Sequence, residues 1–177
     1  MLVLATPHMK PLAFIKESGL SDAAGFVNVD KHTTQHVTYP NIFSLGDSSS
    51  LPTSKTAAAI AAQSSITTQN LLSVVENKPL TAKYNGYTSC PLVTGRGKLI
   101  MAEFQGPGYG ATPLETFYFD QAIERKSMYA VKANFLPSVY WGRMLKGKWD
   151  GMVLSKSFNS CVGPGRYRSL TNPFNKN

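Results

Sequence analysis

Three side chains of this sequence stand where they could take part in chemistry: Asp47, Lys55 and Cys90. Asp47 follows Gly46 directly after a short apolar run, where a carboxylate could accept hydrogen bonds from sugar or ribityl hydroxyls. Lys55 precedes a run of alanines, and its charge would add to the positive field of a helix N-terminus. Cys90 is followed by a proline, and the chemistry open to such a cysteine is that of an attacking thiolate.

Each of these residues also has a plain structural explanation. Gly46 and Asp47 fit an ordinary strand, turn and helix with a lysine on the surface. Cys90, taken without any relative, fits a small buried hydrophobe better than a redox centre. His32 and His36 are four residues apart, but no third ligand is near in sequence. We therefore interpret them as two exposed histidines and expect no metal site.

Short elements must position the turn. The apolar residues 42–45 predict a buried strand, and Gly46 permits the bend that ends it. A helix is predicted over residues 52–76, because Pro52 and Thr53 suit its start and Asn-Lys-Pro at 77–79 stops it. The core contacts of this helix are expected from its larger apolar side chains: Ile60, Leu71, Leu72 and Val75.

The remaining elements are shorter. We expect loops over residues 8–40, with a turn at 21–25 and a half-buried strand at 26–30. Two strands at 92–93 and 99–104, joined around residues 95–97, predict a hairpin that begins just after Cys90.

Two helices are predicted after the hairpin. The first covers about residues 120–134, and Pro137 opens the second. Apolar residues near helical spacing are expected to face the core: Ile123, Met128, Val131 and Phe135. Charged residues are expected on the wet face: Glu124, Arg125, Lys126 and Lys132.

Residues 139–149 interleave aromatic and basic side chains and contain no acid. This pattern fits a helix at a membrane interface, with its rings at headgroup depth and its cations near anionic lipid. A helix packed on the rest of the protein and a nucleic-acid patch are the alternatives, and we favour the membrane because leucine and methionine accompany the rings. No uninterrupted apolar stretch approaches the roughly 20 residues that a membrane span needs.

Length and composition limit the class of protein. The 177 residues are 42% hydrophobic, which suffices for one globular core and argues against disorder. Two cysteines are too few for a disulfide-rich secreted scaffold. The net charge is +8, with 6 basic against 5 acidic residues up to Thr88 and 12 against 5 from Ser89 onward. Such a basic half attracts nucleic acid, anionic lipid or an acidic partner alike.

Three blocks of the chain resemble the mitochondrial-type sulfide:quinone oxidoreductases, which belong to the FAD-dependent pyridine nucleotide-disulfide oxidoreductase superfamily. The first is the Gly46-Asp47 turn followed by Leu-Pro-Thr-Ser-Lys-Thr-Ala-Ala-Ala at 51–59 and by Gln63, which is similar to the second flavin-binding motif of the family. The others are Tyr-Asn-Gly-Tyr-Thr-Ser-Cys-Pro-Leu-Val-Thr-Gly at 84–95 and Pro-Leu-Glu-Thr-Phe at 113–117. The match extends to about Trp149.

The resemblance implies a fold. The chain would be an α/β protein, the C-terminal part of a flavoprotein with two dinucleotide-binding domains, followed by an α+β region with a hairpin and amphipathic C-terminal helices. Residues 1–78 would be part of the FAD-binding domain, with the N-terminal glycine-rich turn missing. Residues 79–150 would form the α+β region with helices that face membrane and quinone, and residues 151–177 a divergent tail.

The resemblance also implies an activity. In this family sulfide is oxidised through a cysteine persulfide, electrons pass through FAD to a membrane quinone, and a small thiol or sulfite accepts the sulfur. Cys90 matches one of the two cysteines of the family's redox disulfide, so the resemblance favours a catalytic role over a packing role. Gly46, Asp47 and Lys55 match the FAD site.

The resemblance places the protein at the mitochondrial inner membrane, as a peripheral or monotopic protein without a nucleic-acid partner. Four aromatic residues are candidates for an apolar quinone channel, although each fits plain core packing better: Tyr84, Tyr87, Phe104 and Phe117.

Several residues depart from the pattern of the family. Relatives often have cysteine where this chain has Ser48, and their second redox cysteine lies upstream. Cys161 lies in a stretch rich in Ser, Asn and Gly and is no obvious substitute. The glycines at 106–110 lack the preceding strand of a dinucleotide-binding turn, and the apolar run at 2–5 reads as a strand entered midway. We therefore expect a C-terminal fragment that is inactive by itself.

Two other functions stay open. One is a non-catalytic basic module that binds membrane lipid or RNA through its C-terminal half. The other is a type II NADH:quinone oxidoreductase, which shares a similar Gly-Asp turn. Cys90 within Thr-Ser-Cys-Pro argues against the second of these alternatives.

Overall fold

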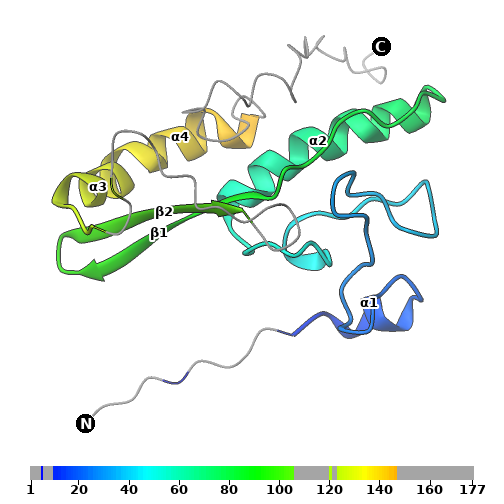
Figure 1. The fold of residues 1–177 in the computed structure, drawn as a ribbon, viewed down its shortest axis with the longest axis horizontal. Coiled ribbons are helices and arrows are strands. Elements are labelled where there is room, and N and C mark those ends of the chain that lie inside the picture. Colours follow the sequence, from blue (N-terminus) through cyan, green and yellow to red (C-terminus); the bar gives the residue numbers. More distant parts are fainter. Residues whose placement is uncertain (1–4, 6–9, 106–119, 121–122, 147–177) are drawn as a thin grey trace, which may run out of the picture.

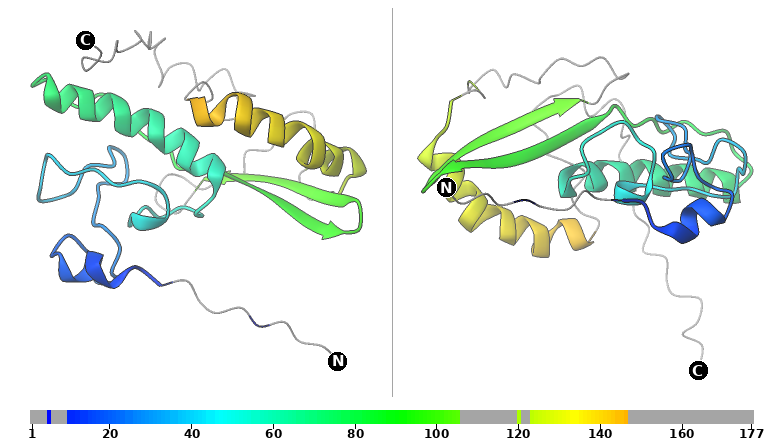
Figure 2. Two further views of the ribbon diagram at one scale, coloured as in Figure 1. Left: turned by 180° about the vertical axis from the view of Figure 1, so that it is seen from behind. Right: turned by 90° about the horizontal axis from the view of Figure 1, so that it is seen from below.

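A computed structural model describes residues 5, 10–105, 120 and 123–146, which form two neighbouring parts (Figure 1). In one part, the loops of the N-terminal third pack against helix α2 (Ala57–Val75). In the other, an antiparallel hairpin of β1 (Tyr87–Gly95) and β2 (Lys98–Gln105) is covered on one face by helical residues 126–142 (Figure 2). The described residues thus form a small α/β arrangement, which confirms the expected class at that level.

Helix α2 begins later than the sequence predicts. Thr56 is its N-cap: the Thr56 backbone is extended, and its side-chain oxygen accepts a hydrogen bond from the Ala59 N–H at 3.1 Å. A capping hydroxyl satisfies a backbone donor that has no partner inside the helix. The predicted start at Pro52 is therefore wrong by five residues. The helix ends at Val75, close to the predicted stop.

The buried face of α2 is built from small and polar residues. Asn70 is fully buried, and its amide donates to the Thr33 and Ala82 carbonyl oxygens, each at 3.0 Å. The Thr67 hydroxyl lies 2.7 Å from that of Thr34. The predicted core residues of this helix are wrong, because all four are exposed: Ile60, Leu71, Leu72 and Val75. The loops supply polar groups that the amide and hydroxyl side chains can satisfy, so the polar face turns inward.

The N-terminal loops are held by isolated bridges rather than by regular strands, and they include a short helix, α1 (Ala13–Glu17). The predicted turn at 21–25 is confirmed. Val27 and Val29 alternate inward as predicted, but they form only single bridges. The strand predicted at 42–45 is wrong: only Phe43 makes a bridge, and the apolar side chains of this segment are half-buried.

The core lies between these loops and α2. It is formed by Ile15, Val27, Val29, Leu51, Ala62, Ile66, Ala82, Tyr84 and Tyr87. His36 is buried beside it, which corrects the prediction that this histidine is exposed. Its Nδ1 accepts from the N–H groups of Thr38 and Tyr39, at 3.0 and 3.1 Å. Its Nε2 therefore donates to the Leu20 carbonyl oxygen at 3.0 Å, and the imidazole serves as a structural bridge.

The predicted hairpin is confirmed, with one difference in its first strand. β1 starts at Tyr87, so Cys90 lies inside the strand, opposite Ala102, rather than just before it. Arg96 and Gly97 form the turn, where Gly97 has a φ of 68°. The cysteine is therefore held by the ladder of hydrogen bonds between the strands.

The helical residues after the hairpin form one run. They comprise α3 (Lys126–Ala130), a π-helical turn η2 (Val131–Phe135) and α4 (Leu136–Gly142), followed by a 3₁₀ turn η3 (Met144–Lys146). Pro137 lies in the first turn of α4, as predicted. The predicted start near residue 120 is wrong, because Arg125 is extended and exchanges backbone hydrogen bonds with Leu99 of β2.

The faces of this run differ in part from the prediction. Met128 and Val131 are half-buried, whereas Ile123 and Phe135, which were expected to face the core, are exposed. Val139 is the buried residue of α4. Lys132 does not lie free on the wet face, since its Nζ donates to the Pro91 carbonyl oxygen at 2.9 Å. This bond ties the helical run to the strand that carries Cys90.

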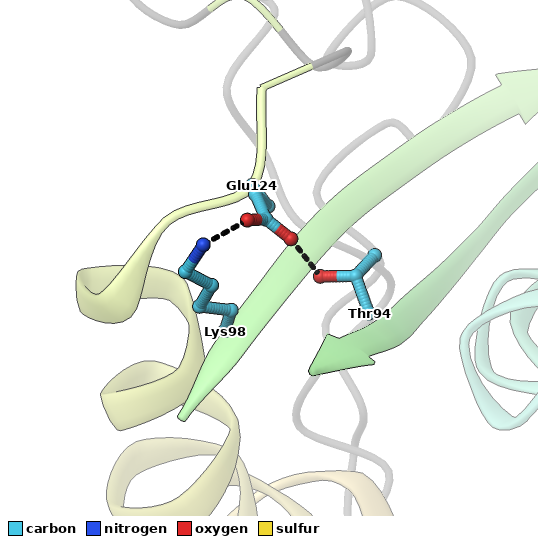
Figure 3. A network of polar contacts seen from close by, with 3 residues as sticks. All are labelled: Thr94, Lys98 and Glu124. Carbon is cyan, nitrogen blue, oxygen red and sulfur yellow. Dashed lines mark hydrogen bonds and ion pairs between the residues drawn. The ribbon is translucent and has the colours of Figure 1, made fainter. Parts of the chain in front are cut away.

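A second polar contact holds the tip of the hairpin (Figure 3). The Thr94 hydroxyl donates to Glu124 Oε2 at 2.7 Å, and Lys98 makes an ion pair with Glu124 Oε1. The hydrogen bonds from Lys98 and Thr94 hold the pKa of the Glu124 carboxyl below its usual value. Because these side chains are exposed, the contact orients the segment before α3 and stabilises it only weakly.

Some predictions fall outside the described residues. These are the apolar residues 2–4, the glycine-rich loop at 106–110, the block at 113–117 with Phe117, Trp149, and the tail with Cys161. Ala5 is described, and it is exposed rather than buried. Across residues 10–105 and 123–146, no helix combines the length and the apolar character that crossing a bilayer requires.

The start of α2 can be tested with Thr56→Ala. The Thr56 hydroxyl caps the helix and also lies 3.0 Å from the Thr88 hydroxyl of β1. We expect the free energy of unfolding, from urea denaturation followed by circular dichroism, to fall by about 1–2 kcal/mol. Thr68→Ala, at an exposed position of the same helix, should leave it unchanged or slightly higher. Equal losses in the two variants would contradict the assignment of Thr56 as the cap.

Candidate functional site

The Gly46–Asp47 turn is fastened to helix α2. Gly46 has a φ of 64° and begins a 3₁₀ turn, η1 (Gly46–Ser48). Its N–H donates to Gln63 Oε1 at 2.8 Å, and Gln63 is 2% exposed. A Cβ at Gly46 would lie 3.0 Å from Ile60 Cγ1, so the helix surface leaves no room for a side chain. The predicted bend at Gly46 is confirmed.

Lys55 closes the same turn from the other side. Its Nζ donates to the Ser49 carbonyl oxygen at 2.7 Å and lies 3.4 Å from the Gly46 carbonyl oxygen. It also lies 4.6 Å from the centre of the Phe26 ring. Partial burial lowers the pKa of Lys55, and the nearby negative charge of Asp47 acts in the opposite direction. The ammonium group therefore holds the loop together and sets the local charge.

Asp47 is the exposed member of this group. It lies in the first turn of η1, on the same loop as Lys55. An exposed carboxylate of this kind can accept hydrogen bonds from ligand hydroxyls. The neighbouring Ser48 hydroxyl instead bonds within the protein, 2.9 Å from that of Ser44 and 3.1 Å from the Leu45 carbonyl oxygen.

A pocket of about 230 Å³ lies where α2, the hairpin and α4 meet. In Figures 1 and 2 the N-terminal end of α2 approaches the open end of the hairpin, with the helical run beside it. The pocket is lined by Thr56, Ala57, Ala58, Tyr87, Ser89, Cys90, Pro91, Met101, Leu136, Val139, Tyr140 and Met144. Cys90 is a half-buried free thiol at this wall. The structure thus brings the predicted cysteine to the start of the predicted alanine helix.

The other three predicted residues lie outside the pocket lining. Gly46, Asp47 and Lys55 sit together on the loop before α2, and they connect to the pocket only through the first turn of that helix. The first turn has N–H groups without partners inside the helix, and its residues Ala57 and Ala58 carry only methyl groups. A flat ligand could therefore approach the backbone closely at this point.

Sequence reasoning assigned no role to several residues that shape the site. Gln63 orients Gly46, and Lys132 holds the Pro91 carbonyl. Gln63 falls on the inward face of α2, which could have been inferred from the small residues around it. Lys132 could not have been found this way, because its contact joins residues 41 positions apart.

Two buried groups on the hairpin add polarity close to the pocket. Tyr87 is 3% exposed and Glu103 is 5% exposed, and the Tyr87 hydroxyl donates to Glu103 Oε1 at 2.9 Å. Burial raises the pKa of the Glu103 carboxyl, while the hydrogen bond from Tyr87 acts against that rise. Tyr84 packs in the core and donates to the Tyr87 carbonyl oxygen at 2.5 Å. Tyr84 is thus a core residue, whereas Tyr87 belongs to both the core and the pocket wall.

A metal centre has no support in the described part of the chain, where no three residues among His, Cys, Asp and Glu gather to hold an ion. The site instead consists of a thiol, an apolar pocket and the start of a helix with small side chains. Together they define an α/β protein with an apolar pocket whose wall carries a cysteine thiol. Such a site suits attack by a thiolate or exchange with a disulfide.

Comparisons with known proteins identify relatives of this chain. Curated sulfide:quinone oxidoreductases of mitochondria are 52% identical over 146 residues in Mus musculus, 50% over 156 in Schizosaccharomyces pombe and 50% over 151 in Dictyostelium discoideum. These alignments cover 82–85% of this chain and 32–33% of the relatives. The chain thus spans about a third of their length.

One solved structure is similar as well. A chain in the cryo-EM structure of the Tetrahymena thermophila mitochondrial ATP synthase matches with a TM-score of 0.64 and 28% identity. The match covers 78% of this chain and 32% of that chain. No protein-family model matches. The sequence identity establishes that the chain is related to the mitochondrial sulfide:quinone oxidoreductases, which confirms the resemblance of its three sequence blocks.

The close packing at Gly46 can be tested against a second glycine. Gly46 and Gly97 both have positive φ, so alanine should cost about 1–2 kcal/mol of backbone strain at either position. At Gly97 a Cβ would meet nothing within 4 Å, whereas at Gly46 it would press on Ile60. We expect Gly46→Ala to lower the free energy of unfolding more than Gly97→Ala.

The excess should disappear when Ile60 is shortened. In an Ile60→Ala background, the cost of Gly46→Ala should fall to that of Gly97→Ala. An unchanged excess would show that contact with α2 does not restrict the turn. Urea denaturation of the four variants measures these differences.

Proposed function

We propose that this chain is the C-terminal portion of a mitochondrial sulfide:quinone oxidoreductase, a flavoprotein enzyme that oxidises sulfide and reduces a membrane quinone. The pocket is the observation that carries the proposal, because Cys90, the first turn of α2 and the aromatic helix α4 all line it. The 50–52% identity to enzymes of that name supports the assignment. The similarity of these relatives also supports a mitochondrial location.

The described residues fit one wall of an FAD site. The first turn of α2 offers small side chains and N–H groups without partners inside the helix, which suit the electron-rich ring of a bound flavin. Asp47 offers an exposed carboxylate for ribityl hydroxyls, and Lys55 and Gly46 hold the turn that presents it. In this proposal residues 1–78 belong to an FAD-binding domain of a protein with two dinucleotide-binding domains, and residues 79–150 form the α+β region. Bound FAD would accept two electrons from the sulfur centre and deliver them to the quinone.

Cys90 carries the sulfur in the proposed reaction. It pairs in a disulfide with a second cysteine, which the family resemblance places upstream of this chain. Hydrosulfide attacks a sulfur of this disulfide, the S–S bond breaks, and a persulfide forms on Cys90 while its partner leaves as a thiolate. A small thiol or sulfite then takes the outer sulfur. The transfer of two electrons from the cysteine pair to a bound FAD would then restore the disulfide.

The protein's contribution to this chemistry is to fix Cys90 and to keep its surroundings dry. The β1–β2 ladder holds the backbone of Cys90 opposite Ala102, and the Lys132 ammonium anchors the next carbonyl, that of Pro91. Met101, Leu136 and Val139 make the pocket apolar. A quinone headgroup could therefore bind beside the cysteine with its rings shielded from water.

The outer surface from the end of α4 through η3 supports contact with a membrane. Trp141 is 67% exposed and Leu145 is 56% exposed, beside the exposed bases Arg143 and Lys146. Aromatic and apolar side chains next to cations suit the boundary between headgroups and acyl chains. We place the protein at the inner membrane as a peripheral or monotopic enzyme that draws quinone through this surface.

The function can be tested by co-expressing the chain with the upstream region of its relatives. We expect a yellow, flavin-bound protein that reduces a short-chain quinone when sulfide is added. Cys90→Ser should keep the flavin absorbance and lose at least about a thousandfold in turnover, because the sulfur carrier is gone. Cys161→Ser serves as the matched control and should keep the activity. A colourless product that binds liposomes or RNA would contradict the proposal.

A further inference from the structure

The pocket-facing side of the hairpin includes a buried carboxyl group that the sulfur chemistry does not use. Tyr87, Ser89 and Pro91 of β1 and Met101 of β2 line the pocket and share one strand parity, and Cys90, between Ser89 and Pro91, also lines it with the opposite parity. Alternate residues of a strand share a face, so the first four mark the face that the pocket occupies. Glu103 lies two positions after Met101 and pairs directly with Ser89. Its side chain therefore leaves the sheet on the same face as the pocket residues.

The Glu103 carboxyl is joined to the pocket wall by one hydrogen bond. The Tyr87 hydroxyl, which donates to Glu103 Oε1 at 2.9 Å, belongs to a residue that lines the pocket. Burying a carboxyl in an apolar sheet is costly, and a glutamine could accept the same hydrogen bond without an ionisable proton. The buried Glu103 carboxyl is thus connected through the Tyr87 hydroxyl to the wall of the apolar pocket.

We propose that Glu103 and Tyr87 form a proton-donating pair for the electron acceptor bound in the pocket. The inference rests on the proposed function, because a quinone that receives two electrons must also receive two protons. Tyr87 is the group that touches the acceptor, and Glu103 acts through it by replacing the proton that the tyrosine gives up. Both side chains are more than nine-tenths buried, so the pair delivers its proton without admitting water to the pocket.

The step balances as follows. The Tyr87 O–H turns from Glu103 Oε1 toward one quinone oxygen, and this O–H bond breaks as its proton bonds to the quinone. The protonated Glu103 carboxyl then donates its own proton to the Tyr87 oxygen. Bound FAD, once reduced by the cysteine pair, would supply the two electrons and the second proton. The products are hydroquinone, oxidised flavin, neutral Tyr87 and the Glu103 carboxylate, which water then reprotonates.

The protonation of Glu103 sets the expected pH dependence. Burial raises the pKa of this carboxyl, so the protonated form persists to higher pH than in an ordinary glutamate. The Glu103 carboxyl therefore carries its proton below that pKa and loses it as pH rises through the pKa. Other titratable groups on the elements packed against β2 are Cys90 on β1 and Lys126 and Tyr129 on α3, and Lys132 of η2 bonds to Pro91 of β1.

The test separates the two halves of the reaction in the flavin-loaded protein co-expressed with the upstream region. Flavin reduction by sulfide without quinone reports the proposed function, and reoxidation by a short-chain ubiquinone reports the proton pair. In Glu103→Gln and Tyr87→Phe, we expect reduction by sulfide within about twofold of wild type. Reoxidation should slow by about a hundredfold, the size of a general-acid contribution.

The pH profile distinguishes a proton donor from a structural residue. Wild-type reoxidation should slow as pH rises through the pKa of Glu103, and Glu103→Gln should lack this dependence. Glu124→Gln is the matched control, because it removes an exposed carboxylate at the hairpin tip and should keep the wild-type rate and profile. Wild-type reoxidation rates and profiles in both Glu103→Gln and Tyr87→Phe would overturn the proposal.

A second measurement does not need a working enzyme. Infrared difference spectra of the 177-residue chain with and without ubiquinone should show a shifted C=O band of a protonated carboxyl group. The band should be absent in Glu103→Gln and present in Glu124→Gln. If the flavin-loaded wild type is not reduced by sulfide, the proposed function fails while this band still tests the pair. Its absence from the wild type would overturn the pair even if sulfide reduction is normal.

Discussion

The hydrogen bonds at the start of α2 hold the two parts of the structure together. Thr56 caps the helix and bonds to Thr88, so one side chain fixes both the helix start and the base of the hairpin. Gln63 follows seven residues later on the same face of the helix and fixes Gly46. The Gly-Asp turn and the cysteine-bearing strand are therefore positioned by the same face of one helix. Without this helix face, Cys90 and Asp47 would not be fixed relative to each other.

Two ionisable groups, Lys55 before α2 and Glu103 on β2, are partly or fully buried. Lys55 is partly buried among carbonyl oxygens and Glu103 lies beside a tyrosine hydroxyl, so burial opposes the charged form of each. The exposed Asp47 carboxylate acts against the fall in the pKa of Lys55. The Lys98–Glu124 ion pair lies instead at the exposed tip of the hairpin. The interior thus remains poor in fixed charge close to the pocket.

The sequence predicted local features well and long-range packing poorly. The bend at Gly46, the hairpin turn at Gly97 and the role of Pro137 follow from backbone preferences of single residues, and the structure has all three. The inward face of α2 does not follow from hydrophobicity, because the Gln63 side-chain oxygen and the Asn70 side-chain NH2 group bond to loops distant in sequence. The pocket that Cys90 lines together with Ala57 and Val139 could not be predicted in detail, since it depends on three elements packing together. The roles of Asp47 and Lys55 toward a flavin stay predictions.

The π-helical turn η2 gives the helical run an unusual phase. A π turn holds one extra residue compared with an α turn, and such turns are frequent at functional sites. Lys132 lies within η2 and reaches β1, while Val139 beyond it faces the pocket. Losing one residue here would rotate everything after it by roughly 100° and turn Val139 away. The direction in which α4 faces is thus set by a single inserted residue. Insertions or deletions in η2 should therefore disturb the pocket far more than substitutions of its side chains.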